Sequence, residues 1–140
     1  MTSKDTYHRC LKTMYGLKRF GIILGLETIR SILDGLGKPH RNYACIHVAG
    51  TNGKGSVAAV LSAILFESGY KVGLYTSPHL VRFNERICIN NRQISNDEVV
   101  QSYKAVKRVH YGDRSPTFFE FATAMALYAF SRHRVDWAVI

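Results

Sequence analysis

Seven consecutive residues in the middle of the chain contain three glycines, a lysine and a serine. Glycine permits backbone angles that are closed to other residues, so such a loop can turn several amide N–H groups inward onto phosphate oxygens. The lysine would place its charge on the β- and γ-phosphates of a nucleotide, and a serine hydroxyl is an oxygen ligand of the kind that Mg²⁺ prefers. The predicted phosphate loop consists of Gly50, Thr51, Asn52, Gly53, Lys54, Gly55 and Ser56.

The spacing of this loop departs from the common pattern G-x-x-x-x-G-K-[ST]. Val48 stands where the pattern has its first glycine, and Gly55 separates Lys54 from Ser56. The alternative is a glycine-rich turn with an incidental lysine. We favour a phosphate loop because an apolar run precedes these residues and a helical pattern follows them.

The elements around the loop are a strand before it and a helix after it. Residues 44–48 are apolar, and residues 56–68 place Val57, Val60, Leu61, Ile64 and Leu65 at helical spacing. Gly69 is placed to cap that helix, and residues 72–75 form the next apolar run. Residues 44–76 are therefore predicted to form a right-handed βαβ crossover.

The remaining segments extend this arrangement. The residue patterns predict helices over 27–36, 95–110 and 117–132, a small hairpin over 86–94, and a third apolar strand over 135–140. The order of these elements predicts an α/β fold, with a P-loop-type parallel sheet and flanking helices.

The chain ends within its third predicted strand. In a parallel sheet the ligand-binding groups follow the carboxyl ends of the strands, so a strand with nothing after it supplies none. Asp136 begins this strand and would lie at the opposite end of the sheet from the phosphates. We expect a single ATP-binding domain over residues 1–140 that is truncated, and whose last strand is an uncovered edge that impairs folding.

Composition limits the classes of partner. A chain of 140 residues with 46% hydrophobic residues can bury one core of ordinary domain size. A net charge of +9 permits an acidic partner, but the basic residues are spread from Lys4 to Arg134, which favours plain surface charge first, an anionic small molecule second and nucleic acid last.

The three cysteines are far apart and odd in number, which predicts reduced thiols. With neither a leader nor an apolar run of about 18 residues, we expect a cytoplasmic protein.

The loop resembles the phosphate loop of the Mur ligase superfamily, in particular that of folylpolyglutamate and dihydrofolate synthases. Other segments agree with that family in order and spacing: Leu24-Gly-Leu-Glu27, Tyr75-Thr-Ser-Pro-His-Leu80 with its continuation Arg82-Phe-Asn-Glu-Arg-Ile87, and Thr117-Phe-Phe-Glu120. The resemblance covers most of residues 20–140, and together the motifs are highly specific. It implies part of a Mur-ligase central ATPase domain.

The family's activity implies a reaction for this chain. ATP would phosphorylate a carboxylate of dihydropteroate or a folate, and the amino group of L-glutamate would then displace phosphate to form an amide. Lys54 would be the catalytic phosphate clamp, and Ser56 and Ser77 would supply oxygens to Mg²⁺. The resemblance assigns the pterin or folate to Gly25, Leu26, Thr117 and Phe119.

Plainer roles remain open for several of these residues. From its position alone, Ser77 is a turn-forming residue before Pro78, and His79 is a loop residue. Phe118 and Phe121 are predicted to lie in the core, and Glu120 to cap its helix.

The resemblance also implies that some of the family's machinery lies beyond Ile140. The remaining metal ligands, a modified lysine and the C-terminal glutamate-ligase domain would follow this residue, so we expect the chain to be inactive alone and its parent to be monomeric. The alternatives are another P-loop NTPase, such as a small-molecule kinase, and a non-catalytic nucleotide-binding or nucleic-acid-binding module, which only the charge favours. We expect no nucleic-acid or membrane partner.

Overall fold

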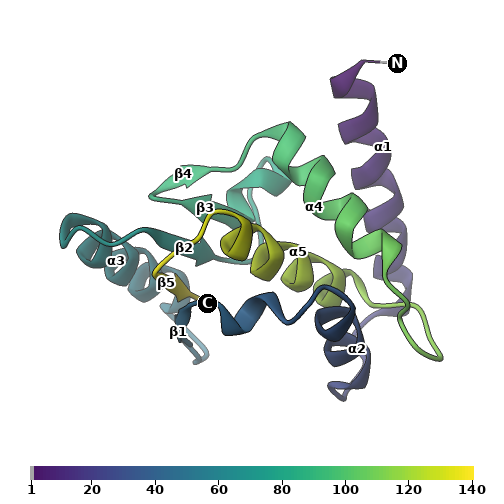
Figure 1. Cartoon of the computed structure of the whole chain (residues 1–140), viewed down its shortest axis with the longest axis horizontal. Helices are drawn as coiled ribbons and strands as arrows, with labels where there is room; N and C mark the ends of the chain where they lie inside the picture. Colours follow the sequence, from purple (N-terminus) through teal and green to yellow (C-terminus); the bar gives the residue numbers. More distant parts are fainter. Residues whose placement is uncertain (1) are drawn as a thin grey trace. The chain divides into compact units, whose positions relative to one another are not determined.

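The computed structural model describes residues 2–140, which form five α-helices, three short 3₁₀ segments and a five-stranded sheet (Figure 1). The α-helices are α1 (Ser3–Gly16), α2 (Glu27–Gly35), α3 (Lys54–Glu67), α4 (Asn96–Arg108) and α5 (Phe118–Arg132). The strands are β1 (Ala44–Ile46), β2 (Val72–Tyr75), β3 (Ile87–Ile89), β4 (Arg92–Gln93) and β5 (Trp137–Val139). Three short 3₁₀ segments are η1 (Leu17–Phe20), η2 (Pro39–Arg41) and η3 (Phe83–Arg86).

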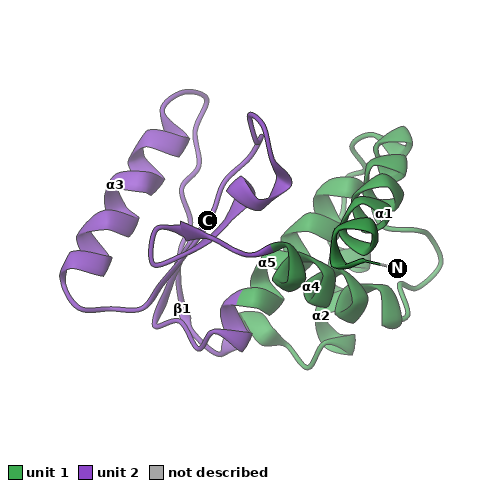
Figure 2. Cartoon of the chain, turned by 90° about the horizontal axis from the view of Figure 1, so that it is seen from above, with its two compact units in different colours: residues 1–40, 96–129 green, residues 41–95, 130–140 purple. Residues whose placement is uncertain are grey.

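The chain divides into two compact units, coloured separately in Figure 2. Unit 1 comprises Met1–His40 and Asn96–Ala129, and unit 2 comprises Arg41–Ser95 and Phe130–Ile140. Unit 2 holds the whole sheet and α3, whereas α1, α2 and α4 belong to unit 1. The single domain expected over residues 1–140 stays a prediction.

The sheet of unit 2 confirms the α/β class and adds detail to it. Strands β1, β5 and β2 are parallel, and α3 contacts both β2 and β5. The predicted hairpin joins the sheet as the antiparallel strands β3 and β4, which makes the sheet mixed. Its turn uses Asn90 and Asn91 at φ 49° and 63°, the left-handed angles that asparagine tolerates best among non-glycine residues.

The position of β5 contradicts one expectation. The strand order is β1-β5-β2-β3-β4, so β5 lies between β1 and β2 and is the centre of the parallel part, not an uncovered edge. The predicted crossover from β1 to β2 therefore spans one intervening strand. Asp136 lies at the amino end of β5 as expected, where its carboxylate accepts the Lys71 N–H at 2.7 Å.

Helix α3 buries only part of its apolar surface. Ala58 is buried against Val72 and Val139, with Leu61 and Leu65 packed beside them. Val57, Val60 and Ile64 are 51%, 59% and 56% exposed. The predicted helix is therefore confirmed, and these three residues stay exposed because the sheet covers one side of a helix that is apolar on several sides.

The core of unit 1 forms where helices pack side by side. Helices α1 and α4 contact each other along their length (Figure 1), and the Ser3 hydroxyl donates to the Asp97 carboxylate at their amino ends. On α4, Val99 and Val106 are fully buried, whereas His110 beyond its end is exposed. Phe118 and Phe121 are buried, which confirms their core assignment.

Two further features concern the cysteines and the length of the helices. Cys10, Cys45 and Cys88 are all free thiols. No helix within residues 2–140 combines the length and apolar character that a membrane crossing requires.

Candidate functional site

The predicted phosphate loop lies between the carboxyl end of β1 and the start of α3. The β1–β5 ladder continues past the strands, since the Ile140 N–H donates to the Ile46 carbonyl at 2.9 Å and the Val48 N–H to the Ile140 carbonyl at 2.7 Å. From Gly50 onward the chain leaves the ladder, and every residue through Ser56 is exposed. The loop is therefore open to a ligand at the edge of the sheet where parallel α/β folds bind theirs.

Gly53 is the residue at which the loop becomes a helix. Its φ of 75° and ψ of 6° are left-handed, which favours glycine, and its carbonyl accepts the Val57 N–H at 3.0 Å. No side chain caps this end of α3. The first amides of α3 therefore point outward at the positive end of the helix dipole, which is the arrangement that binds a phosphate group.

Lys54 lies across the loop that contains it. Its ammonium group donates to the Gly50 carbonyl at 2.5 Å. The ammonium group is thus held near the loop backbone, where it can exchange the carbonyl oxygen for the oxygens of a bound phosphate.

Ser77 follows β2 and lies at the same edge of the sheet as the phosphate loop, because β1 and β2 both run parallel to β5. The residues after it are held in place by the side chain of Glu85. The Glu85 carboxylate accepts the N–H groups of Leu80, Val81 and Arg82 at 2.9, 2.8 and 2.6 Å. These three bonds, that from Arg82 foremost, hold the pKa of Glu85 below its usual range.

His79 is part of the same loop. Its Nδ1 accepts a hydrogen bond from Arg86 Nε at 2.7 Å, and the Arg86 carbonyl accepts the Thr76 N–H at 3.0 Å. The side chain of His79 is thus engaged by an arginine, which agrees with its prediction as a loop residue.

The residues predicted to bind the pterin or folate all belong to unit 1, whereas the phosphate loop and Ser77 belong to unit 2. Phe119 is 58% exposed and Leu26 is 56% exposed. Thr117 is only 4% exposed, and its hydroxyl accepts the Glu120 N–H at 3.2 Å. Gly25 has a φ of 115° in the turn before α2. Phe119 and Leu26 therefore present surface to a ligand, and Thr117 serves the start of α5.

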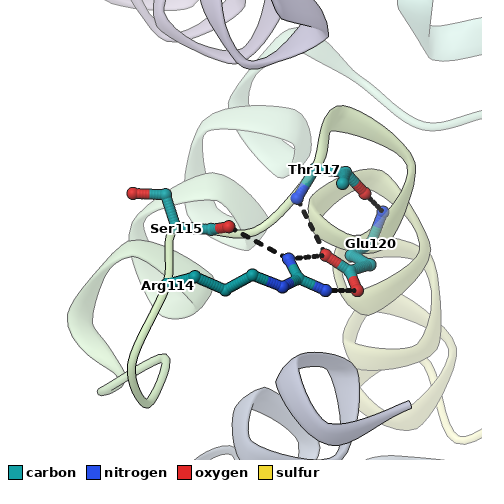
Figure 3. Close-up of polar contacts among 4 residues, drawn as sticks. All are labelled: Arg114, Ser115, Thr117 and Glu120. Carbon is teal, nitrogen blue, oxygen red and sulfur yellow. Dashed lines mark hydrogen bonds and ion pairs between the residues drawn. The ribbon is translucent and has the colours of Figure 1, made fainter. Parts of the chain in front are cut away.

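Arg114 was not anticipated from the sequence. Its guanidinium binds the Glu120 carboxylate with two bonds, from Nη2 at 2.7 Å and from Nη1 at 2.9 Å (Figure 3). The spacing of Thr117 and Glu120 is that of a helix-capping box, which the structure shows. The capping-box spacing could be read from the sequence, whereas the burial of Glu120, which makes a cation necessary, could not.

A divalent cation would find hydroxyl oxygens here rather than a cage of acidic side chains. Within residues 2–140 no group of three or more His, Cys, Asp or Glu side chains is placed to hold a metal ion. Magnesium often keeps water ligands and binds chiefly through nucleotide phosphates, so the hydroxyls of Ser56 and Ser77 fit such an ion.

Comparison with known proteins finds relatives that cover most of this chain. No protein-family model matches the chain. A probable bifunctional folylpolyglutamate synthase/dihydropteroate synthase of Haloferax volcanii is 40% identical over 139 residues, which cover 96% of this chain and 16% of that protein. A dihydrofolate synthase/folylpolyglutamate synthase of Bacillus subtilis is 38% identical, over 95% of this chain and 32% of that protein.

Solved structures agree with these relatives. A folylpolyglutamate synthase of Thermotoga maritima superposes with a TM-score of 0.88 at 42% identity, covering 99% of this chain and 33% of that one. The bifunctional enzyme of Yersinia pestis, complexed with AMPPNP and Mn ion, gives 0.86 at 35% identity, over 95% of this chain and 32% of that one. Escherichia coli FolC in complex with DHPP and ADP gives 0.84 at 34% identity, over 93% and 32%. The chain spans about a third or less of the length of the relatives described.

Proposed function

The chain is homologous to a segment of the folylpolyglutamate and dihydrofolate synthases, and we propose that it is the ATP-binding part of such a ligase. The enzyme adds L-glutamate to dihydropteroate or to a folate. Two relatives of known structure support the nucleotide and the metal, since one is complexed with AMPPNP and Mn ion and another with ADP and DHPP.

The observation that carries this proposal is the start of α3. Gly53 adopts a left-handed conformation, the first-turn amides are uncapped, and the Lys54 ammonium lies over the loop. Together these groups bind and orient a chain of phosphates and offset its negative charge.

The reaction requires clamped phosphates more than a protein nucleophile. The γ-phosphoryl group of ATP passes to a carboxylate oxygen of the acceptor, leaving ADP. The amino nitrogen of glutamate then bonds to that carbonyl carbon, inorganic phosphate leaves, and the nitrogen loses a proton. Mg²⁺, when bound, neutralises charge on the phosphates. Lys54 holds the β- and γ-phosphates, and Ser56 and Ser77 offer their hydroxyl oxygens on the metal side.

Nucleotide binding by the chain tests the proposal directly. Isothermal titration with ATP and Mg²⁺ should show one site, and Lys54→Ala should weaken it at least tenfold, because hydrogen bonds to charged groups contribute about 1.5–3 kcal/mol each. Lys71→Ala is the matched control, since Lys71 lies in the same unit at the amino end of β2. An equal loss of ATP affinity in both variants would mean that Lys54 acts only through its surface charge, and it would refute the role of Lys54 as phosphate clamp.

The rival classes give different outcomes in two further measurements. In a protein that contains this chain with its ligase partner domain, glutamate-dependent release of ADP and phosphate is expected with dihydropteroate or folate. Phosphate transfer to a small molecule without any need for glutamate would indicate a kinase. Oligonucleotide binding that falls steeply between low and moderate salt would indicate a nucleic-acid module.

A further inference from the structure

We propose that Arg114 is a positioning residue that holds together the two segments expected to bind the acceptor. One segment leads into α2 and contains Gly25 and Leu26; the other begins α5 and contains Thr117 and Phe119. The role rests on the proposed function, because it concerns the acceptor of that same reaction. All the residues involved belong to unit 1.

Arg114 is joined to α5 by a bidentate ion pair with Glu120 (Figure 3). Both terminal nitrogens of the guanidinium reach the Glu120 carboxylate, and Nη1 also donates to the Ser115 carbonyl at 3.1 Å. Glu120 Oε2 in turn accepts the Thr117 N–H at 2.8 Å. Arg114 therefore determines where the first turn of α5 begins, and Phe119 extends from that turn.

Burial makes this pair more than a surface ion pair. The Glu120 side chain is 10% exposed and that of Arg114 is 30% exposed. Burial would raise the pKa of Glu120, but the bonds from Arg114 and Thr117 outweigh it and hold that pKa below its usual range. If Arg114 were removed, a buried carboxylate would lose its counter-charge, and the first turn of α5 would have to rearrange.

The link from Arg114 to α2 runs through the loop that carries Arg114. The hydrogen bond to Glu120 raises the pKa of Arg114 most, and the charge of Glu27 adds to it. Glu27 is the first residue of α2, and its carboxylate folds back over Gly25, where an added Cβ would lie 2.4 Å from Oε2. The loop that carries Arg114 also runs beside α2, because a Cβ on Gly112 would contact Ser31 Oγ at 3.8 Å.

Unit 1 exposes apolar side chains on the same two segments. Among the described residues of unit 1, the large apolar side chains that are exposed all belong to the same two segments: Phe20, Ile22, Ile23, Leu24, Leu26 and Phe119. The Lys18 ammonium in η1, just before the first segment, lies 5.0 Å from the ring centroid of Phe118 at the start of α5 and 4.9 Å from that of Tyr15. Such a surface suits a flat heterocycle, and Arg114 would fix the spacing between its two parts.

A purely local role for Arg114 predicts a different result from a positioning role. If Arg114 only stabilises the first turn of α5, its removal speeds amide hydrogen exchange at residues 117–121 alone. If it also positions the other segment, exchange speeds up at residues 25–29 as well. This readout needs no ligand, so it tests Arg114 even if the proposed acceptor is wrong.

The experiment compares Arg114→Ala, Arg114→Lys and the exposed-arginine control Arg108→Ala in the full chain. We expect Arg114→Ala to speed exchange in both segments and to weaken folate binding roughly tenfold, with ATP affinity changed less than about twofold. Arg114→Lys, which keeps the charge but loses the bidentate geometry, should fall between these values. Arg108→Ala should match the unmodified chain.

Two results would overturn the proposal. One is exchange confined to residues 117–121 in Arg114→Ala, and the other is an equal loss of ATP and folate affinity. If the unmodified chain binds ATP but no folate, the proposed acceptor is wrong; the exchange pattern then still decides whether Arg114 couples the two segments.

Discussion

The ring of Phe130 lies directly against the backbone of Gly73. A Cβ built on Gly73 would sit 2.4 Å from Phe130 Cδ1, closer than any real side-chain contact allows. Phe130 is the first residue of the part of α5 that belongs to unit 2, and Gly73 lies in β2. This close approach lets Phe130 pack against β2.

Gly73→Ala should therefore destabilise the protein by roughly 1–3 kcal/mol, the usual cost of overpacking a core. Denaturant unfolding followed by circular dichroism measures the change. Gly16→Ala is the matched control, because an added Cβ there meets nothing within 4 Å at a helical φ of −59°. It should stabilise by about 0.4–1 kcal/mol. An unchanged unfolding midpoint in Gly73→Ala would show that the ring moves aside freely.

Two glycines of the phosphate loop should respond differently to the same substitution. Gly53 has a φ of +75°, so Gly53→Ala should cost about 1–2 kcal/mol of stability through backbone strain. An added Cβ on Gly55 would have no neighbour within 4 Å, and the backbone of Gly55 is not left-handed. Gly55→Ala should therefore leave the stability unchanged or slightly raised.

Gly55→Ala should nevertheless weaken ATP binding, because its methyl group would occupy the approach of the phosphates to the first turn of α3. Titration calorimetry and thermal unfolding on the same variant separate the two effects. Full ATP affinity in a stable Gly55→Ala protein would mean that phosphates do not approach this turn.

Ser77→Ala should raise the Mg²⁺ concentration needed for half-maximal ATP binding, since it removes one oxygen from the metal side of the site. The affinity without metal should change little. Ser68→Ala is the control: Ser68 lies at the far end of α3, where its hydroxyl donates to the Ile64 carbonyl. Superimposable magnesium titrations for Ser77→Ala and the unmodified chain would restrict Ser77 to forming its turn.

Acid should weaken unit 1 partly through Glu120. Its pKa in the folded chain lies below its usual range, so its stabilising contribution is present above the unfolded pKa and is lost as pH falls through the folded value. Thermal unfolding between about pH 7 and pH 3 should therefore show a smaller loss of stability in Glu120→Gln than in the unmodified chain. Asp113→Asn, an exposed carboxylate of the neighbouring loop, serves as the comparison. Identical pH dependence in Glu120→Gln and the unmodified chain would show that the Glu120 carboxylate does not contribute to the loss of stability in acid.

Local features of this protein were determined by the sequence alone. The glycines and lysine of the phosphate loop, the Asn90-Asn91 turn and the glycine at the end of α3 each depend on backbone angles within a few residues. Such local signals do not depend on the rest of the fold, so the predicted strands, hairpin and helices α2 to α5 differ from the structure only at their ends.

Only the tertiary structure decided which distant segments meet. Strand β5 lies at the centre of the parallel strands because β1 and β2 both pair with it, and no pattern within residues 135–140 encodes that order. The exposed side of α3 and the pairing of Arg114 with Glu120 are also outcomes of packing. Whether an apolar or charged side chain is covered depends on the neighbour that the fold places against it, and that neighbour is not written in the side chain's own segment.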